Sequence, residues 1–171
     1  MTEPDAEQRR RDHCQVPSNE AWHSHQFRVR HEFPGEVVYS RKFPALPDAA
    51  SLARRLARMA LVSWHLPGEA VETAELLIAE IVSNAVRFGG SLEPKCSEPR
   101  CADSVGLILR LHADELIIET SDSNQSPPVL AEPGYEAEYG RGLWLVDQLS
   151  KKWGHHNQPW GGKTVYCVVG I

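Results

Sequence analysis

The sequence predicts an α+β fold, a two-layer sandwich in which helices cover one mixed, mainly antiparallel sheet. Three observations lead to this expectation. Two long segments, 49–64 and 69–88, repeat apolar residues at helical spacing. About four shorter segments are apolar enough to form strands. Two of these, 105–111 and 115–121, are joined by only three residues, which indicates an antiparallel hairpin.

The ordered part of the chain is expected to begin with a strand and a helix. Apolar residues between 37 and 43 indicate the strand, and Pro44 and Pro47 end it. Asp48 is then expected to cap the helix over 49–64. The residues predicted to be on the buried face of this helix are Leu52, Leu56, Met59 and Ala60.

The second helix, 69–88, has the clearest pattern. Gly89 and Gly90 follow it and are expected to stop it. Its predicted buried face consists of Ala74, Leu77, Ile78, Ile81, Val82 and Ala85.

A long segment, 122–139, follows the hairpin and contains three prolines, and a connection of this length is usually functional. A third helix is expected over 142–152, and a turn at Gly161-Gly162 leads into a last strand, 164–169. The residues that this third helix is expected to bury are Leu145, Val146, Leu149 and Trp153.

Composition limits both the class of protein and its partners. The chain has 171 residues, is 42% apolar and 24% charged, and carries a formal net charge of −5. This acidic balance argues against direct nucleic-acid binding, which needs a basic surface. No apolar run reaches the roughly 18 residues that cross a bilayer, and the first residues lack an apolar signal core. We therefore expect a cytoplasmic protein without membrane contact, whose four cysteines are reduced thiols.

The chain is expected to divide into a tail and one domain. Residues 1–35 are polar and poor in aliphatic side chains, which indicates a disordered tail, and its histidines follow no zinc-binding spacing. Residues 36–171 are expected to form a single ordered domain. Within it, a loop over 91–104 carries Cys96 and Cys101, which are at most half of a metal site.

The second helix carries the first group of residues that indicates chemistry. Glu80, Asn84 and Arg87 share one face at the edge of the apolar stripe. A carboxylate in that place can accept a proton, and an amide oxygen one turn later can bind a hard cation such as Mg²⁺. An ordinary solvated helix edge is the alternative interpretation.

Two further groups lie where strands and helices meet loops. Asp122 ends an apolar strand, where an aspartate can accept a hydrogen bond from an amine such as that of adenine, or simply start a turn. Gly140-Arg141-Gly142 precedes a helix, and glycines beside free helix N–H groups suit a polyphosphate. A flexible helix start is the alternative. Gly162-Lys163-Thr164 is not the end of a Walker A loop, because Asn157 stands where that motif needs a glycine and a strand follows.

The order of these groups along the chain resembles the histidine kinase-like ATPase superfamily, and within it the small branch of anti-sigma factors and serine-protein kinases. Residues 80–87 resemble the N box, and Asp122 falls where the first glycine-box aspartate belongs. Residues 140–146 resemble the second glycine box, and residues 161–165 resemble the closing turn and strand. The resemblance covers roughly residues 36–169.

The resemblance implies ATP and Mg²⁺ as ligands and gives each site residue a role. It implies that Glu80 is the catalytic base for the attacking hydroxyl and that Asn84 holds Mg²⁺. It also implies that Asp122 binds the adenine amine with support from Thr164, and that residues 123–139 form a lid. The residues that it implies for ATP binding are Asn84, Arg87, Asp122, Gly140, Arg141, Gly142, Leu143 and Thr164.

The function that the resemblance implies is an ATP-binding regulator of transcription. It would transfer the γ-phosphate of ATP to a serine of a protein antagonist, and sequestration of a sigma factor and a homodimer are both compatible with it. A catalytically inactive ATP-binding or protein-interaction module is the main alternative, and a detached sensor histidine kinase domain is a third. Residues 123–128 replace the glycines of the wider superfamily with a segment that the small branch often has, and the lid carries several glutamates. Both features also favour the inactive module.

Overall fold

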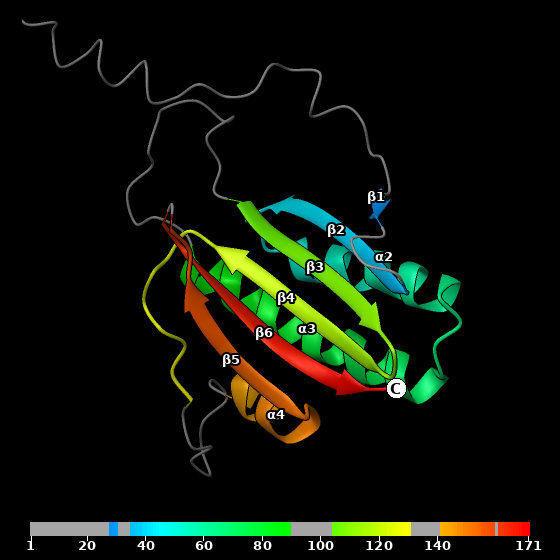
Figure 1. Cartoon of the computed structure of the whole chain (residues 1–171). Coiled ribbons are helices and arrows are strands. Elements are labelled where there is room, and N and C mark those ends of the chain that lie inside the picture. The colour runs from blue at the N-terminus through cyan, green and yellow to red at the C-terminus, as the bar shows by residue number, and fades with distance from the viewer. Residues whose placement is uncertain (1–27, 31–34, 90–103, 131–140, 160) are drawn as a thin grey trace, which may run out of the picture.

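The structure, a computed structural model, describes residues 28–30, 35–89, 104–130, 141–159 and 161–171. Within these residues, one six-stranded sheet has the strand order β1-β2-β3-β4-β6-β5, and every neighbouring pair is antiparallel. The three helices lie behind the sheet in Figure 1, so the predicted two-layer α+β sandwich is confirmed. The described pairings include no parallel one, although the sequence predicted a mixed sheet. The elements are β1 (Arg28–Arg30), β2 (Glu36–Pro44), α2 (Ala49–Ser63), α3 (Gly68–Gly89), β3 (Ser104–His112), β4 (Glu115–Asp122), α4 (Arg141–Leu149), β5 (Lys152–Asn157) and β6 (Lys163–Gly170).

The core lies between the sheet and α3, which crosses behind the middle of the sheet. All six residues predicted for the buried face of α3 are buried. Alternate residues of the central strands face them, because successive side chains of a strand point to opposite faces of a sheet. The largest of these strand residues are Leu107, Leu109, Leu116 and Ile118, all fully buried. Each such side chain stabilises the fold by about 1.5–3 kcal/mol, and together they hold α3 at a fixed position on the sheet.

The buried face of α2 differs from the predicted one. Leu52 and Leu56 are only half-buried, and Met59 is 60% exposed. The buried residues are Ala49, Ala53, Ala57, Ala60 and Leu61. Alanines at this spacing let the backbone of α2 approach α3 closely, and the larger side chains are then left at the rim. Asp48 does precede the helix, but its side chain makes no capping hydrogen bond.

The third helix is shorter than predicted, and an extra strand follows it. α4 ends at Leu149, which is 42% exposed, and β5 occupies residues 152–157. The sequence Lys-Trp-Gly-His-His-Asn has no alternation of apolar residues, because β5 is an edge strand that pairs only with β6. Trp153 is half-buried, and its Nε1 donates to Asp147 Oδ1 of α4 at 2.8 Å. This contact ties the short helix to the edge of the sheet.

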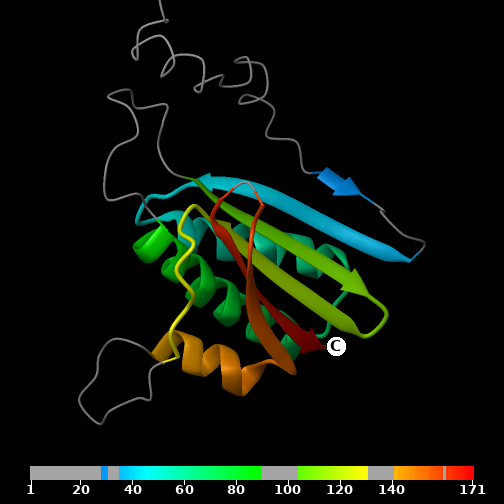
Figure 2. The same ribbon diagram turned by 60° about the vertical axis from the view of Figure 1, so that its left-hand side comes forward.

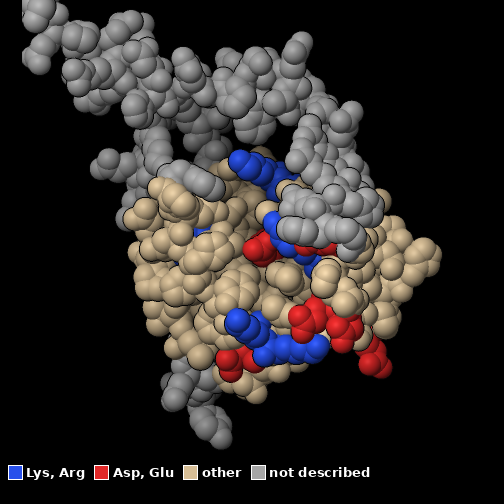
Figure 3. Space-filling view, in the orientation of Figure 1, with Lys and Arg blue, Asp and Glu red and all other residues tan. Residues whose placement is uncertain are grey.

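The outer face of the sheet carries charged residues of both signs. Arg110 lies 3.0 Å from Glu119 and 3.8 Å from Glu36 in ion pairs that link β2, β3 and β4. Figure 3 shows basic and acidic side chains interspersed on the part of this face that it draws in colour. Among the described residues, no helix is both long and apolar enough to span a membrane.

Several predictions concern residues that the structure does not describe. The tail over residues 1–27 and 31–34 and the loop with Cys96 and Cys101 lie outside the described residues. The domain boundary at residue 36 therefore stays a prediction, although β1 adds three residues to the sheet before it. The described cysteine, Cys167 of β6, is a free thiol in the core, and burial raises its pKa to about 12.

Candidate functional site

A cleft of about 680 Å³ opens between α3, α4 and the adjoining ends of β4 and β6. This volume is in the range of ordinary small-molecule sites. Figure 2 shows that α4 lies next to α3. Of the nine predicted site residues, Gly140 lies outside the described residues and Thr164 does not line the cleft. The seven that line it are Glu80, Asn84, Arg87, Asp122, Arg141, Gly142 and Leu143. The fold therefore gathers residues from three separate segments of the chain into one cavity.

One end of the cleft, called here the α4 end, is formed where α4 starts against α3. Glu80 and Asn84 lie one turn apart on α3, and both are half-buried. A Cβ atom on Gly142 would collide with Glu80 Oε2 and would lie 3.6 Å from Asn84 Nδ2. Glycine leaves room for this approach without displacing Glu80, so the first turn of α4 rests directly on these two polar side chains.

The position of this helix start gives the α4 end its electrostatic character. The first N–H groups of a helix have no partner within the helix, and they carry the positive end of its dipole. Arg87 and Arg141 are exposed and line the same cleft. The guanidinium of Arg87 also lies 5.9 Å from the centre of the Phe88 ring. The α4 end therefore combines a carboxylate and an amide with the cation of Arg141 and a helix N-terminus, a combination that can hold an anion and accept a proton.

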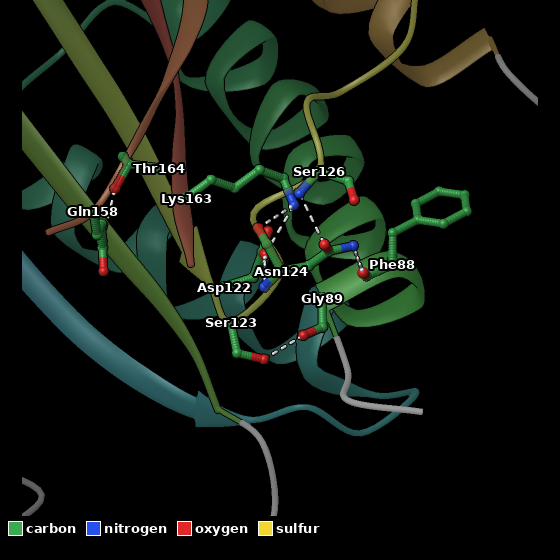
Figure 4. Close-up of polar contacts among 9 residues, drawn as sticks. All are labelled: Phe88, Gly89, Asp122, Ser123, Asn124, Ser126, Gln158, Lys163 and Thr164. Atoms are coloured by element: carbon green, nitrogen blue, oxygen red, sulfur yellow. Dashed lines mark hydrogen bonds and ion pairs between the residues drawn. The ribbon is translucent and has the colours of Figure 1, made fainter. Parts of the chain in front are cut away.

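The opposite end, called here the β4 end, consists of Thr120, Asp122 and Lys163. Lys163 Nζ donates to Asp122 Oδ1 at 2.9 Å, and the two side chains are only 6% and 3% exposed. The backbone N–H of Asn124 donates to the same oxygen at 2.8 Å, as Figure 4 shows. The predicted adenine residue, Asp122, is thus held in a fixed position by a buried ion pair.

Two glycines allow the chain to pack around Asp122. A Cβ atom on Gly89, the last residue of α3, would lie 2.9 Å from Asp122 Cγ. Gly162 has a φ of +84°, and a Cβ atom there would collide with the backbone oxygen of Asp122. The end of α3 and the turn before β6 therefore both depend on glycine at these places, and they enclose the carboxylate on two sides.

The segment after Asp122 caps the end of α3. Ser123 Oγ donates to the backbone oxygen of Gly89 at 2.5 Å, and Asn124 Nδ2 donates to that of Phe88 at 2.6 Å. The last carbonyl groups of a helix need such partners, because the helix itself supplies none. Ser123 and Asn124, which stand where the wider superfamily has glycines, thus have a structural role as the cap of α3. The predicted lid is described only as far as residue 130, so its glutamates lie outside the described residues.

Thr164 is not where the sequence placed it. It pairs with Ser121 across the β4–β6 ladder, and its Oγ1 accepts a hydrogen bond from Gln158 Nε2 at 2.8 Å. Because side chains alternate along a strand, Thr164 points to the face of the sheet away from the helices. Lys163, which pairs with Asp122, points into the cleft instead. The support that Thr164 was expected to give Asp122 comes from Lys163.

Sequence reasoning gave Lys163 no role in the site, because it considered that residue only within a rejected Walker A loop and as one member of the closing turn and strand, where Thr164 was given the role. The signal was present in the strand itself, where Val165, Cys167 and Val169 alternate as inward-facing apolar residues. Extending that alternation back by two residues places Lys163 on the inner face.

One comparison with known proteins supports the fold. Residues 43–167, well over half of the chain, match the family model described as the histidine kinase-like ATPase domain. No curated protein matches the chain, whereas 13 chains of solved structures do. One is the crystal structure of the RsbU and RsbW domains of Rv1364c from Mycobacterium tuberculosis. It is 16% identical with a TM-score of 0.49, and the match covers 77% of this chain and 32% of that one. The chain thus spans about a third of the length of that protein.

Proposed function

Since the chain belongs to the histidine kinase-like ATPase family, we propose that it is an ATP-dependent regulator that acts as a protein-serine kinase. In this proposal the γ-phosphate of ATP passes to a serine of a protein antagonist, and the protein also sequesters a sigma factor. This is the function of the branch that the sequence motifs resemble. The observation that supports it best is the α4 end of the cleft, where Glu80, Asn84 and the start of α4 meet.

The residues of the cleft fit a nucleotide and its cation. The β4 end has acceptor and donor groups of the kind that bind a base, including a buried Thr120 hydroxyl without a partner among the described residues. Leu143 and Val165 give the cleft apolar wall area, and the α4 end suits phosphates. We propose Asn84 as the protein ligand of Mg²⁺. When bound, that ion would neutralise negative charge on the phosphate oxygens.

Each residue of the α4 end has a role in this proposal. Glu80 accepts the proton of the serine hydroxyl, a task that typically contributes about 10²–10⁴-fold to a rate. Arg87, Arg141 and the first N–H groups of α4 hold the phosphates in place, and Gly142 allows their close approach. Phosphoryl transfer depends mainly on positioning and charge stabilisation, and these groups supply both. For Gly140, which lies outside the described residues, we propose the role that the sequence motif implies, a backbone contact with the phosphates.

At the β4 end, Asp122 is the proposed acceptor for the amine of adenine. Its Oδ1 already accepts two hydrogen bonds, from Asn124 and Lys163. Oδ2 receives none of the hydrogen bonds found among the described residues, so we propose that this oxygen meets the base.

A catalytically inactive binding module is the second candidate, and one observation favours it. The Glu80 carboxylate lies against Gly142, beside the helix start where a phosphate would be held. A carboxylate so close repels a phosphate unless a cation lies between them or the side chain turns away. In a module that acts only by contact with a partner, no phosphate has to bind at the start of α4, so the Glu80 side chain would stay in this position.

Nucleotide binding and transfer are tested in sequence. Isothermal titration with ATP should give binding that is weak without Mg²⁺ and stronger with it. Capture of partners should then recover a sigma factor or an antagonist protein, and the captured antagonist should gain phosphate on serine from γ-labelled ATP. Absence of binding with and without the ion would refute the nucleotide site. Binding of ATP and partner without transfer would favour the inactive module.

A further inference from the structure

Lys163 is a buried cation that the expected roles leave unexplained. It is only 5% exposed, although lysine is rarely buried unless its charge is paired. Its ammonium group reaches across the β4 end of the cleft to Asp122, as Figure 4 shows. The residue lines the cleft, so a bound ligand would meet it.

The hydrogen bonds of the pair leave one donor and one acceptor for a ligand. An ammonium group has three N–H donors. Lys163 uses two of them, on Asp122 Oδ1 at 2.9 Å and on the backbone oxygen of Asn124 at 3.1 Å. Among the described residues no acceptor takes the third, and none donates to Asp122 Oδ2. The cleft wall therefore presents a hydrogen-bond donor beside an acceptor.

A third polar group at the same end also indicates a ligand. Thr120 lies two residues before Asp122 on β4, so its side chain points to the same face of the sheet. It is 1% exposed, and within the described residues its hydroxyl has no hydrogen-bond partner. Buried hydroxyl groups are nearly always hydrogen-bonded, because an unpaired one is costly. A ligand in the cleft would remove that cost.

We propose that Lys163 is a base-recognition residue, whose ammonium donates to N1 of adenine while Asp122 Oδ2 accepts from the adjacent amino group. This proposal rests on the proposed ATP-binding function. Adenine presents an acceptor, N1, next to a donor, the N6 amino group, which complements the donor and acceptor of the pair. Guanine in the same position would present a carbonyl oxygen to the carboxylate and an N–H to the ammonium. Both contacts would be repulsive, so the pair selects adenine.

The experiment compares ligands that differ at one ring atom. Isothermal titration of the whole chain with Mg²⁺ uses ATP, GTP and 1-deaza-ATP, in which a C–H replaces N1. Wild-type protein should bind 1-deaza-ATP about 10- to 100-fold more weakly than ATP, the range expected for a hydrogen bond to a charged group. GTP should bind at least as weakly as 1-deaza-ATP. Equal affinities for ATP and 1-deaza-ATP would overturn the inference.

Variants assign the effect to Lys163. The double variant Lys163→Met with Asp122→Asn removes both buried charges together, so it avoids an unpaired charge in the core. It should bind ATP more weakly and no longer distinguish ATP from 1-deaza-ATP. The control Lys151→Met removes an ammonium that is 51% exposed and should discriminate like wild type. A double variant that still discriminates at N1 overturns the inference alone, whereas wild-type protein that binds none of the nucleotides overturns the proposed function as well.

Discussion

Replacing the buried Lys163 with methionine should destabilise the fold far more than replacing any exposed lysine among the described residues. Methionine keeps the length of the side chain but removes the charge, and it leaves the Asp122 carboxylate 3% exposed without a cation. Breaking a buried ion pair in this way typically costs about 3–5 kcal/mol, because one charge stays behind without compensation. For a chain of this size each kcal/mol lowers the melting temperature by about 2–4 °C. The expected decrease is therefore about 6–20 °C.

A double-mutant cycle separates the cost of the unpaired charge from the loss of the side chain. Asp122→Asn in the Lys163→Met background replaces the carboxylate with a neutral amide of the same shape. Because neutral replacements of a whole buried pair are often tolerated, this second change should recover most of the lost stability, to within about 1–2 kcal/mol of wild type.

Urea unfolding followed by circular dichroism and tryptophan fluorescence measures all four corners of the cycle. Lys151→Met is the matched control. Its partner Glu115 is 3.4 Å away and both side chains are about half-exposed, so it should change stability by no more than about 1 kcal/mol. The reasoning is refuted if Lys163→Met is as stable as this control. It is equally refuted if the double variant is no more stable than the single one.

Three further predictions follow from individual residues. Glu80→Gln should lower the rate of serine phosphorylation about 10²–10⁴-fold and leave the affinity for ATP almost unchanged. The control Glu72→Gln, at an exposed position on the same helix, should match wild type. Phosphate transfer by Glu80→Gln at the wild-type rate would show that Glu80 is not the base. Thr120→Val should leave stability unchanged or raise it by about 1 kcal/mol in urea unfolding, because the lost hydroxyl has no partner among the described residues. It should weaken ATP binding about 3- to 10-fold by titration, and unchanged affinity would contradict contact with the base. Cys167, kept as the single cysteine, should react with a thiol reagent at pH 8 only in urea. Its folded pKa of about 12 exceeds the unfolded value near 9.0, so the folded state retains a proton that the unfolded state loses. Stability should therefore fall as the pH rises from about 9 toward 12, and fast labelling of native protein would show that the thiol is accessible.

The elements best predicted from the sequence are those whose apolar spacing results from one face packing against the core. α3 packs against the middle of the sheet, so its apolar spacing gave both its buried face and the neighbouring Glu80 and Asn84. The α2 prediction assumed that large residues are buried. Close packing of two helices instead favours alanine, and Met59 is left outside. β5 was missed because an edge strand with polar residues has no apolar alternation to detect.

The site was predicted less completely, since part of it depends on strand register. A shift of one residue along a strand exchanges its two faces, and the choice between Lys163 and Thr164 is such a shift. The sequence motif indicated Thr164, whereas the pairing of β4 with β6 puts Lys163 opposite Asp122. The ion pair between them joins residues 41 positions apart, and local patterns carry no information about such a contact.

The packing of Gly89 against Asp122 has a consequence for the length of ligand that the cleft can accept. Glu80 and Gly89 belong to one unbroken helix, nine residues apart, which fixes a span of about 13.5 Å at the usual rise of 1.5 Å per residue. The length of α3 thus sets the distance between Asp122, at the β4 end of the cleft, and Glu80, the proposed proton acceptor at the α4 end. Under the proposed function, a nucleotide that is shorter by one phosphate and seated on Asp122 would stop short of Glu80. In that proposal, the length of α3 would let the cleft distinguish a triphosphate from a diphosphate by reach alone.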